Sequence, residues 1–354
     1  MPTYSALDAI SPAFARTKLV LYSPFRLGRT WKLSITAYLA MASGIFMPLF
    51  LLAFAFLPQL RQYGGTTLVT AVIITAIVLT LFFGWIFYLC TRLRFAFFDI
   101  TLNRGQFVAP AWNKYGPAAF RWALFKVVIG TLFTAATAAP IVAFYRHFFT
   151  MISSLQPGQQ PPPEFMFELM SGYFTVYIFF IVFMWLSSVL SDFIVPSLAL
   201  ENTTLSEAFR RLGQLIRTEP GQFSGYAFMK LVLAVAGYMG TTIAFEIAII
   251  IVGCIIAIIA VLIGLALHAA GLSMPVLVGL GITVGVIFYG FAIWAMMFGI
   301  GTVLTFLESY TLYFLAGRYP MLGELLAAST PAPTTVSPLY PNPYPPYTPP
   351  PPVG

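Results

Sequence analysis

Three carboxylic acids lie within apolar stretches of this chain: Asp192, Glu246 and Glu308. A charge in lipid is costly, so such residues usually face the protein interior or water, and they often line a proton-coupled path or a polar binding site. A structural alternative places all three near the inner membrane boundary, where they cap helices or pair with Arg or Lys. Depth favours this alternative, because one crossing of about 20 residues, counted from the turn near Gly271, ends close to Glu246.

Residues that commonly support catalysis or metal binding are sparse. His147 and His268 are the only histidines, and neither has a carboxylate at helical ligand spacing. Cys90 and Cys254 each lie alone in an apolar stretch, where cysteine behaves as a small hydrophobic residue. The sequence has no Gly-rich phosphate loop and no HExxH or GxSxG motif. We therefore expect no enzyme activity, no metal and no cofactor.

The composition is that of a membrane protein. Hydrophobic residues make up 59% of the 354 residues, charged residues 8%, and the mean hydropathy is +0.88. A soluble domain needs more charge to cover its surface. The net charge is +7, but the basic residues lie in loops between apolar segments. This distribution indicates membrane topology and argues against nucleic-acid binding.

The apolar segments predict an all-α, polytopic transmembrane bundle with six spans. Four have the length of one crossing, and two are nearly twice that length; in order they are about Leu33–Leu57, Leu68–Cys90, Ala123–Tyr145, Gly172–Leu198, Phe228–Leu267 and Pro275–Leu315. Each of the last two is expected to be one long or kinked helix. In an alternative with eight shorter spans, they break near Gly237–Thr241 and Gly299–Thr302.

The basic residues also predict the orientation. Lys and Arg gather before the first span, between spans two and three, between spans four and five, and after the last span. Cytoplasmic loops are the ones enriched in these residues, so both termini are expected to be cytoplasmic. Small residues at helical spacing, among them Gly281 and Gly285, predict that the last two helices pack as a hairpin.

Three regions are predicted to flank or interrupt the transmembrane domain of residues 32–320. Residues 1–31 form a basic cytoplasmic segment. Residues 204–217 form an amphipathic helix that opens with a capping box at Thr204 and Glu207. Its arginines Arg210, Arg211 and Arg217 are candidates for contact with anionic lipid headgroups, although its apolar face could equally pack against the protein. Residues 321–354 form a proline-rich, disordered cytoplasmic tail that could bind a protein partner.

The segments Arg16–Arg26, Ser191–Pro196 and Glu308–Tyr313 resemble uncharacterised six-helix bacterial membrane families. A related domain is the membrane portion of some glycerophosphoryl diester phosphodiesterases. The resemblance implies six helices, an interfacial helix before the fifth, and a bacterial cytoplasmic (inner) membrane. It supplies no substrate and no catalytic residue, and the soluble barrel that would carry hydrolysis has no counterpart in this sequence.

The leading functional hypothesis is a non-enzymatic membrane scaffold that organises lipids or partners. It rests on the basic loops, the amphipathic helix and the tail, all predicted on one side of the membrane. The alternative is a transporter or permease for a small solute or lipid. That function needs a water-accessible cavity lined by Asp192 or Glu246.

Overall fold

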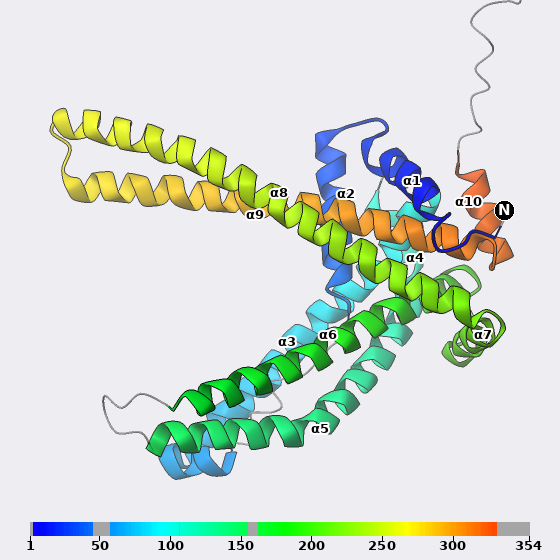
Figure 1. Cartoon of the computed structure of the whole chain (residues 1–354), viewed down its shortest axis with the longest axis horizontal. Helices are drawn as coiled ribbons and strands as arrows, with labels where there is room; N and C mark the ends of the chain where they lie inside the picture. The colour runs from blue at the N-terminus through cyan, green and yellow to red at the C-terminus, as the bar shows by residue number, and fades with distance from the viewer. Residues whose placement is uncertain (1–2, 45–56, 106, 155–161, 331–354) are drawn as a thin grey trace, which may run out of the picture.

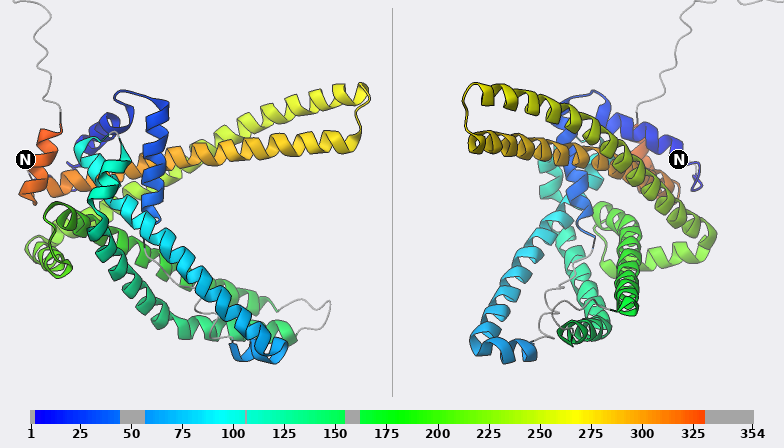
Figure 2. Two further views of the ribbon diagram at one scale, coloured as in Figure 1. Left: turned by 180° about the vertical axis from the view of Figure 1, so that it is seen from behind. Right: turned by 60° about the vertical axis from the view of Figure 1, so that its left-hand side comes forward.

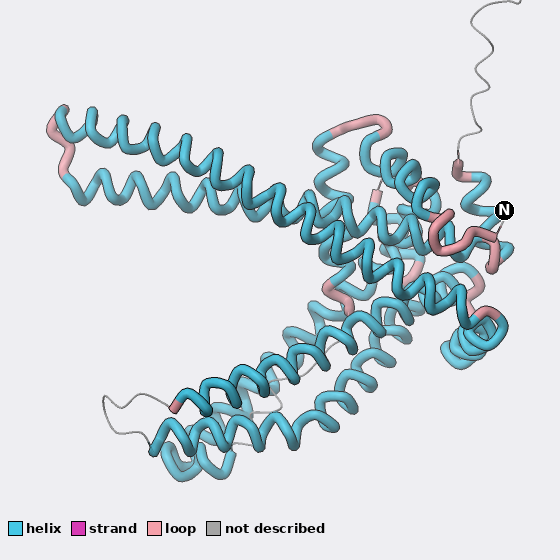
Figure 3. The backbone as a smooth tube through the Cα atoms, viewed as in Figure 1, coloured by secondary structure: helices cyan, strands magenta, loops and turns pink. Residues whose placement is uncertain are grey.

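The structure is a computed structural model that describes residues 3–44, 57–105, 107–154 and 162–330. Within these ranges the regular elements are helices, as the sequence predicts. The short ones are α1 (Ile10–Tyr22), α2 (Leu27–Met41), α4 (Val108–Lys114), α7 (Leu205–Thr218) and α10 (Pro320–Ala328), and the long ones are α3 (Leu57–Asn103), α5 (Gly116–Ser154), α6 (Pro163–Leu200), α8 (Pro220–Ala269) and α9 (Met274–Ala316). Figure 3 shows how little of the described chain is loop.

The helices form one base and two diverging arms (Figure 1). The base comprises the five short helices and the adjoining ends of the five long ones. The first arm, the α8–α9 arm, is the projecting hairpin of those two helices, and the second, the α3–α5–α6 arm, is formed by the projecting parts of those three (Figure 2). The long helices extend well beyond the base. The longest, α8, has 50 residues, which corresponds to about 75 Å at 1.5 Å per residue.

Five helical segments are long and apolar enough to cross a membrane, as expected for a multi-pass membrane protein: Gly65–Asn103, Gly116–Ala138, Pro163–Leu200, Pro220–Ala269 and Met274–Ala316. The first predicted span, Leu33–Leu57, falls partly on α2, which has 15 residues. Residues 45–56 of that span lie outside the described residues. The structure therefore supports five spans, and the sixth stays a prediction.

The two double-length apolar stretches are continuous helices, α8 and α9, so the eight-span alternative is wrong. Two glycines in the proposed break segments, Gly237 and Gly299, lie where the two helices approach each other. A Cβ on Gly237 would lie 2.6 Å from Val303, and one on Gly299 would lie 2.7 Å from Thr241. The predicted hairpin is present, but Gly281 and Gly285 face open space and do not mediate it.

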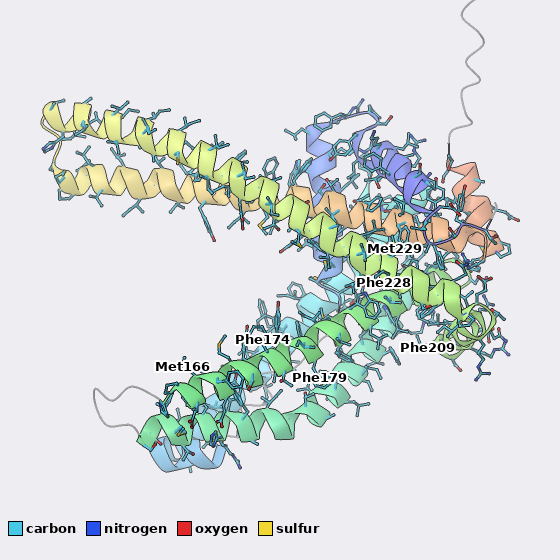
Figure 4. All side chains as sticks on the ribbon, in the orientation of Figure 1. Met166, Phe174, Phe179, Phe209, Phe228 and Met229 are labelled. Atoms are coloured by element: carbon cyan, nitrogen blue, oxygen red, sulfur yellow. The ribbon has the colours of Figure 1, made fainter. Side chains whose placement is uncertain are left out.

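The core of the protein lies in the base. Its main cluster of buried apolar residues draws on α1, α3, α5, α6, α7, α8, α9 and α10. Tyr226 of α8 stacks on Phe314 of α9 with ring centroids 4.4 Å apart. In contrast, the arms expose large apolar side chains, such as Phe174 and Phe179 of α6, which Figure 4 labels. Such exposure suits helices that face lipid.

The C-terminal region corrects one sequence expectation, and the N-terminal region contains a helix that packs into the base. Residues 320–328 were assigned mostly to the disordered tail, yet they form α10, whose Leu322 and Leu326 are fully buried in the core. The amphipathic spacing of these two leucines explains the helix. The basic N-terminal segment forms α1 and packs into the base with one face. Residues 331–354, the rest of the predicted tail, lie outside the described residues.

Arg16 joins both terminal helices to α3. Its side chain is fully buried and donates hydrogen bonds to the carbonyl oxygens of Thr101 and Leu102 at the end of α3 and of Ser329 at the end of α10. Helix C-termini carry partial negative charge, so two helix ends offset the charge of one guanidinium. Burial nevertheless lowers the pKa of Arg16.

Candidate functional site

Two of the three candidate carboxylates meet in the base. Asp192 lies on α6 and Glu308 on α9, and both side chains are at least 95% buried. Arg94 of α3 joins them: it forms an ion pair with Glu308 and another with Asp192, the latter at 3.2 Å between Nη2 and Oδ1. Lys230 of α8 forms a second ion pair with Asp192. We call these four residues the ionic cluster.

Neutral side chains complete the hydrogen bonds of the ionic cluster. The Tyr226 hydroxyl donates to Asp192 Oδ2 at 2.7 Å and also contacts Thr311 Oγ1 at 2.8 Å. Lys230 Nζ donates to Ser188 Oγ at 3.0 Å. Asp192 therefore accepts from three donors on two helices, and the network connects α3, α6, α8 and α9.

The cluster has the properties of a structural tie. Two cations face two anions, so its formal charge is zero. Each charge has an opposite partner, which offsets the desolvation cost of several kcal/mol per buried ion. Because the charged groups come from four long helices, the cluster fixes how those helices cross in the base. Asp192 and Glu308 thus meet basic side chains, as the structural alternative predicts.

A fifth charged residue lies beside the cluster. Lys126 of α5 is buried and donates to the Ser43 carbonyl oxygen at 2.5 Å, and its ammonium lies 5.2 Å from the centroid of the Trp122 ring. A backbone carbonyl and an aromatic face are both electron-rich partners for a cation. Lys126 therefore connects the α3–α5–α6 arm to the end of α2.

Glu246, the third candidate carboxylate, does not belong to the cluster. Its side chain is exposed on α8. Sixteen positions separate it from Lys230, which is about 24 Å along a helix. The physical reason is that α8 continues past the base into the α8–α9 arm, where α9 is its neighbour among the described helices (Figure 1).

The helix predicted to contact lipid is α7, and two of its three candidate arginines have carboxylate partners within the protein. The Thr204 hydroxyl accepts from the Glu207 amide at 3.3 Å, which confirms the N-cap. The Glu207 side chain, however, binds Arg210 at 2.9 Å and Arg211 at 3.2 Å. These hydrogen bonds, first from Arg210 and then from Arg211, lower the pKa of Glu207. Arg211 also pairs with Glu201.

The apolar face of α7 packs against the protein. Ala208 and Leu212 are buried in the main core, and the Phe209 ring lies 5.0 Å from the ring of Phe125 in α5. This was the second of the two interpretations that the sequence allowed. Of the three predicted lipid-contact arginines, two are paired with carboxylates, while Arg217 is exposed and forms no ion pair with a described residue.

The cationic half of the cluster is absent from the sequence prediction. Arg94 and Lys230 were interpreted as loop charges that set topology, because each lies at the inner end of an apolar stretch. One signal was available in the sequence. Lys230 lies near the start of the apolar stretch Phe228–Leu267 and Asp192 near the end of its own span, and both of these are predicted inner ends. Ionisable residues of opposite sign at matching depth predict a pair.

Other polar features lie apart from the cluster. A surface hollow of about 500 Å³ is lined by residues before α1, by the start of α8 and by Arg318. A hollow of about 60 Å³ is lined by His147 and Glu168 among others, and His147 Nε2 lies 3.5 Å from Glu168 Oε2. Neither hollow includes a member of the ionic cluster. In the described ranges, no three His, Cys, Asp or Glu residues are placed to share a metal ion.

Comparison with known proteins places this chain in a family. A family model, described as a family of unknown function (DUF7544), matches residues 4–325. No curated protein and no solved structure matches the chain. The proposed relation to the membrane domain of glycerophosphoryl diester phosphodiesterases stays a prediction. Because the match extends from the residues before α1 into α10, the chain belongs to the family of unknown function DUF7544.

Proposed function

We propose that this protein is a non-enzymatic membrane scaffold of the bacterial cytoplasmic membrane, which organises lipids or protein partners. Its base faces the cytoplasm, and its two arms extend into the bilayer. The orientation rests on the Lys and Arg bias of the loops. The bacterial setting rests on the sequence resemblance.

One observation carries the proposal: the buried carboxylates Asp192 and Glu308 are bound by Arg94 and Lys230. A transport site needs groups that exchange a proton or solute with water. Carboxylates held between cations and a tyrosine hydroxyl are poorly suited to that exchange. They are well suited to holding helices at fixed angles, which is what a scaffold requires.

The arms support the same proposal. In the most apolar 18-residue window of α8, none of the residues is buried within the chain. This surface is available to lipid or to another membrane protein. A rigid base with two apolar arms can therefore hold membrane components at a fixed spacing.

A paired experiment tests this proposal against the transporter alternative. The purified protein is reconstituted into liposomes that contain a pH-sensitive dye, and a photoreactive residue replaces Ile258 or Val286 on the α8–α9 arm in cells. The proposal predicts no proton flux above empty liposomes and discrete protein adducts or a defined lipid adduct from the arm. Proton flux that Asp192→Asn abolishes would instead establish a transporter.

A further inference from the structure

The turn between α1 and α2 concentrates unpaired positive charge. From Ile10 to Phe98 the sequence contains no Asp or Glu. Arg16 points into the base, and the remaining cations of this turn are Lys18, Arg26, Arg29 and Lys32. None of these four forms an ion pair with a described carboxylate. We call residues 14–32 the basic elbow.

The basic elbow also exposes apolar and aromatic side chains. Phe25 is 58% exposed and Leu27 is 54% exposed. The rings of Tyr22 and Phe25 stack with centroids 6.1 Å apart, and Lys18 lies 4.8 Å from the centroid of the Phe14 ring. Aromatic residues next to cations are typical of protein segments at the boundary between lipid and water.

Contacts with α9 place the basic elbow at the boundary between the base and the α8–α9 arm. The Tyr22 hydroxyl lies 3.1 Å from Thr302 Oγ1 of α9. On α9, Met296 is still exposed, whereas Ile300 and Gly301 are buried. Gly301 is in close contact with α2, since a Cβ there would overlap the Ser34 carbonyl oxygen. The elbow therefore lies where the apolar arm ends, which is the level of the inner membrane surface under the proposed function.

Figure 1 shows the connection between α1 and α2 at the outer edge of the base. It is not covered by the helices of either arm in the further views of Figure 2. The exposed side chains of the elbow include the cations Lys18, Arg26 and Lys32, and the elbow offers them no carboxylate. An anionic surface is the partner that complements this combination.

We propose that the basic elbow docks on the anionic inner leaflet of the membrane that the chain spans. Phe25 and Leu27 insert among the headgroups, while Lys18 and Arg26 bind lipid phosphates. Each cation near an anionic membrane surface strengthens binding about fivefold. This lipid contact takes the place assigned from the sequence to Arg210 and Arg211, whose charges Glu207 and Glu201 offset.

The test uses the full-length protein in nanodiscs. Cys254 is exposed and is replaced by serine, Cys90 is buried, and Phe25→Cys then provides a labelling site for an environment-sensitive fluorophore. Nanodiscs contain either phosphatidylcholine alone or phosphatidylcholine with phosphatidylglycerol. We expect the emission to shift to the blue, and spin-labelled lipid to quench it, more strongly in the anionic nanodiscs.

Matched variants distinguish an effect of the elbow's positive charge from an effect of unfolding. The double variant Lys18→Gln/Arg26→Gln should lose most of the shift that depends on phosphatidylglycerol. Arg210→Gln, which also removes an exposed positive charge, should leave the shift unchanged. Thermal unfolding of each variant, followed by reaction of the buried Cys90 thiol, shows that the base remains folded.

Three results would overturn the proposal. The first is water-like emission in both nanodiscs, and the second is an equal shift in both. The third is a shift that appears only in native membranes, which would indicate a protein partner. The proposal rests on the proposed function for the level and the side of the membrane. Proton flux through the reconstituted protein would refute the scaffold without changing the nanodisc result.

Discussion

The base and the α8–α9 arm contain different parts of the same two helices. Carboxylates are buried and paired in the base, whereas the carboxylate of the arm is exposed. In the base, residues of α9 from Leu307 to Ala316 are all buried, and Glu308 pairs with Arg94. In the arm, α8 exposes Glu246 and a run of large apolar residues. Ion pairs between helices thus form in the base, where several helices bury them. The exposed side chains of the arm must instead be covered by lipid or by another protein, whereas the buried side chains of the base contact one another.

The largest effect should come from removing the acceptor shared by the cluster. Asp192→Ala leaves Arg94, Lys230 and Tyr226 buried without their acceptor, so we expect a loss of about 3–5 kcal/mol in the free energy of unfolding. The measurement is thermal unfolding in detergent, with the Cys90 thiol as reporter in a Cys254→Ser background.

Glu246→Ala is the matched control, because it removes an exposed carboxylate from the same type of apolar helix. Its effect should stay within about 0.5 kcal/mol. Equal destabilisation by both variants would contradict the distinction between base and arm.

Arg16→Gln should have the next largest effect. It removes hydrogen bonds at the C-termini of α3 and α10, and each unsatisfied buried carbonyl costs about 1–3 kcal/mol. We expect α10 to detach before the rest of the base unfolds, so limited proteolysis should cleave within residues 320–330 of the variant. Arg16→Lys tests whether the charge alone suffices; protection of α10 in this variant would show that the two-helix contact of the guanidinium is dispensable.

Two glycines of α9 should respond with opposite signs. Gly301→Ala forces α2 away from α9 and should cost about 1–3 kcal/mol, as overpacking does. Gly281→Ala adds a methyl group in open space and should stabilise the helix by about 0.5–1 kcal/mol. Thermal unfolding of the two variants measures both changes. A destabilising Gly281→Ala would reveal that another surface packs there, as in a homodimer.

The smallest effect should be the pH dependence of α7. The pKa of Glu207 lies below its usual value of 4.5 in the folded protein. Its contribution to stability is therefore present above about pH 4.5 and is lost as the pH falls through the lower, folded-state value. Wild type should be slightly more stable than Glu207→Gln at pH 7, and the difference should disappear in acid. A difference that persists at low pH would exclude the ion pairs as its cause.

Sequence reasoning went furthest where local chemistry decides the outcome. Apolar length predicts the long helices, and the Thr204 side chain predicts the start of α7. It failed where a contact joins distant segments. Neither the pairing of Arg94 with Glu308 nor the burial of Arg16 has a local signature, because both depend on how long helices cross. Residues 321–328 were assigned to the tail for a similar reason: proline-rich sequence follows them, and only the docking of Leu322 and Leu326 reveals α10.

The candidate site shows the same limit. Asp192 and Glu308 were identifiable as carboxylates in apolar segments, but Glu246 shares that property and lies elsewhere. The sequence pattern gives depth along a helix and says little about which side of the helix faces a neighbour. Asp192, Glu246 and Glu308 therefore looked equivalent until α8 and α9 were seen to leave the base as an arm.

A double-mutant cycle between Asp192 and Lys230 tests most directly whether the buried carboxylates of the base are structural ties. Unfolding free energies are measured for Asp192→Asn, for Lys230→Met and for the two combined. If the pair is a structural tie, both single variants are strongly destabilised, and the double variant recovers at least about 1 kcal/mol relative to their sum. Mild, additive effects would show that these residues do not hold the base together and would contradict the account.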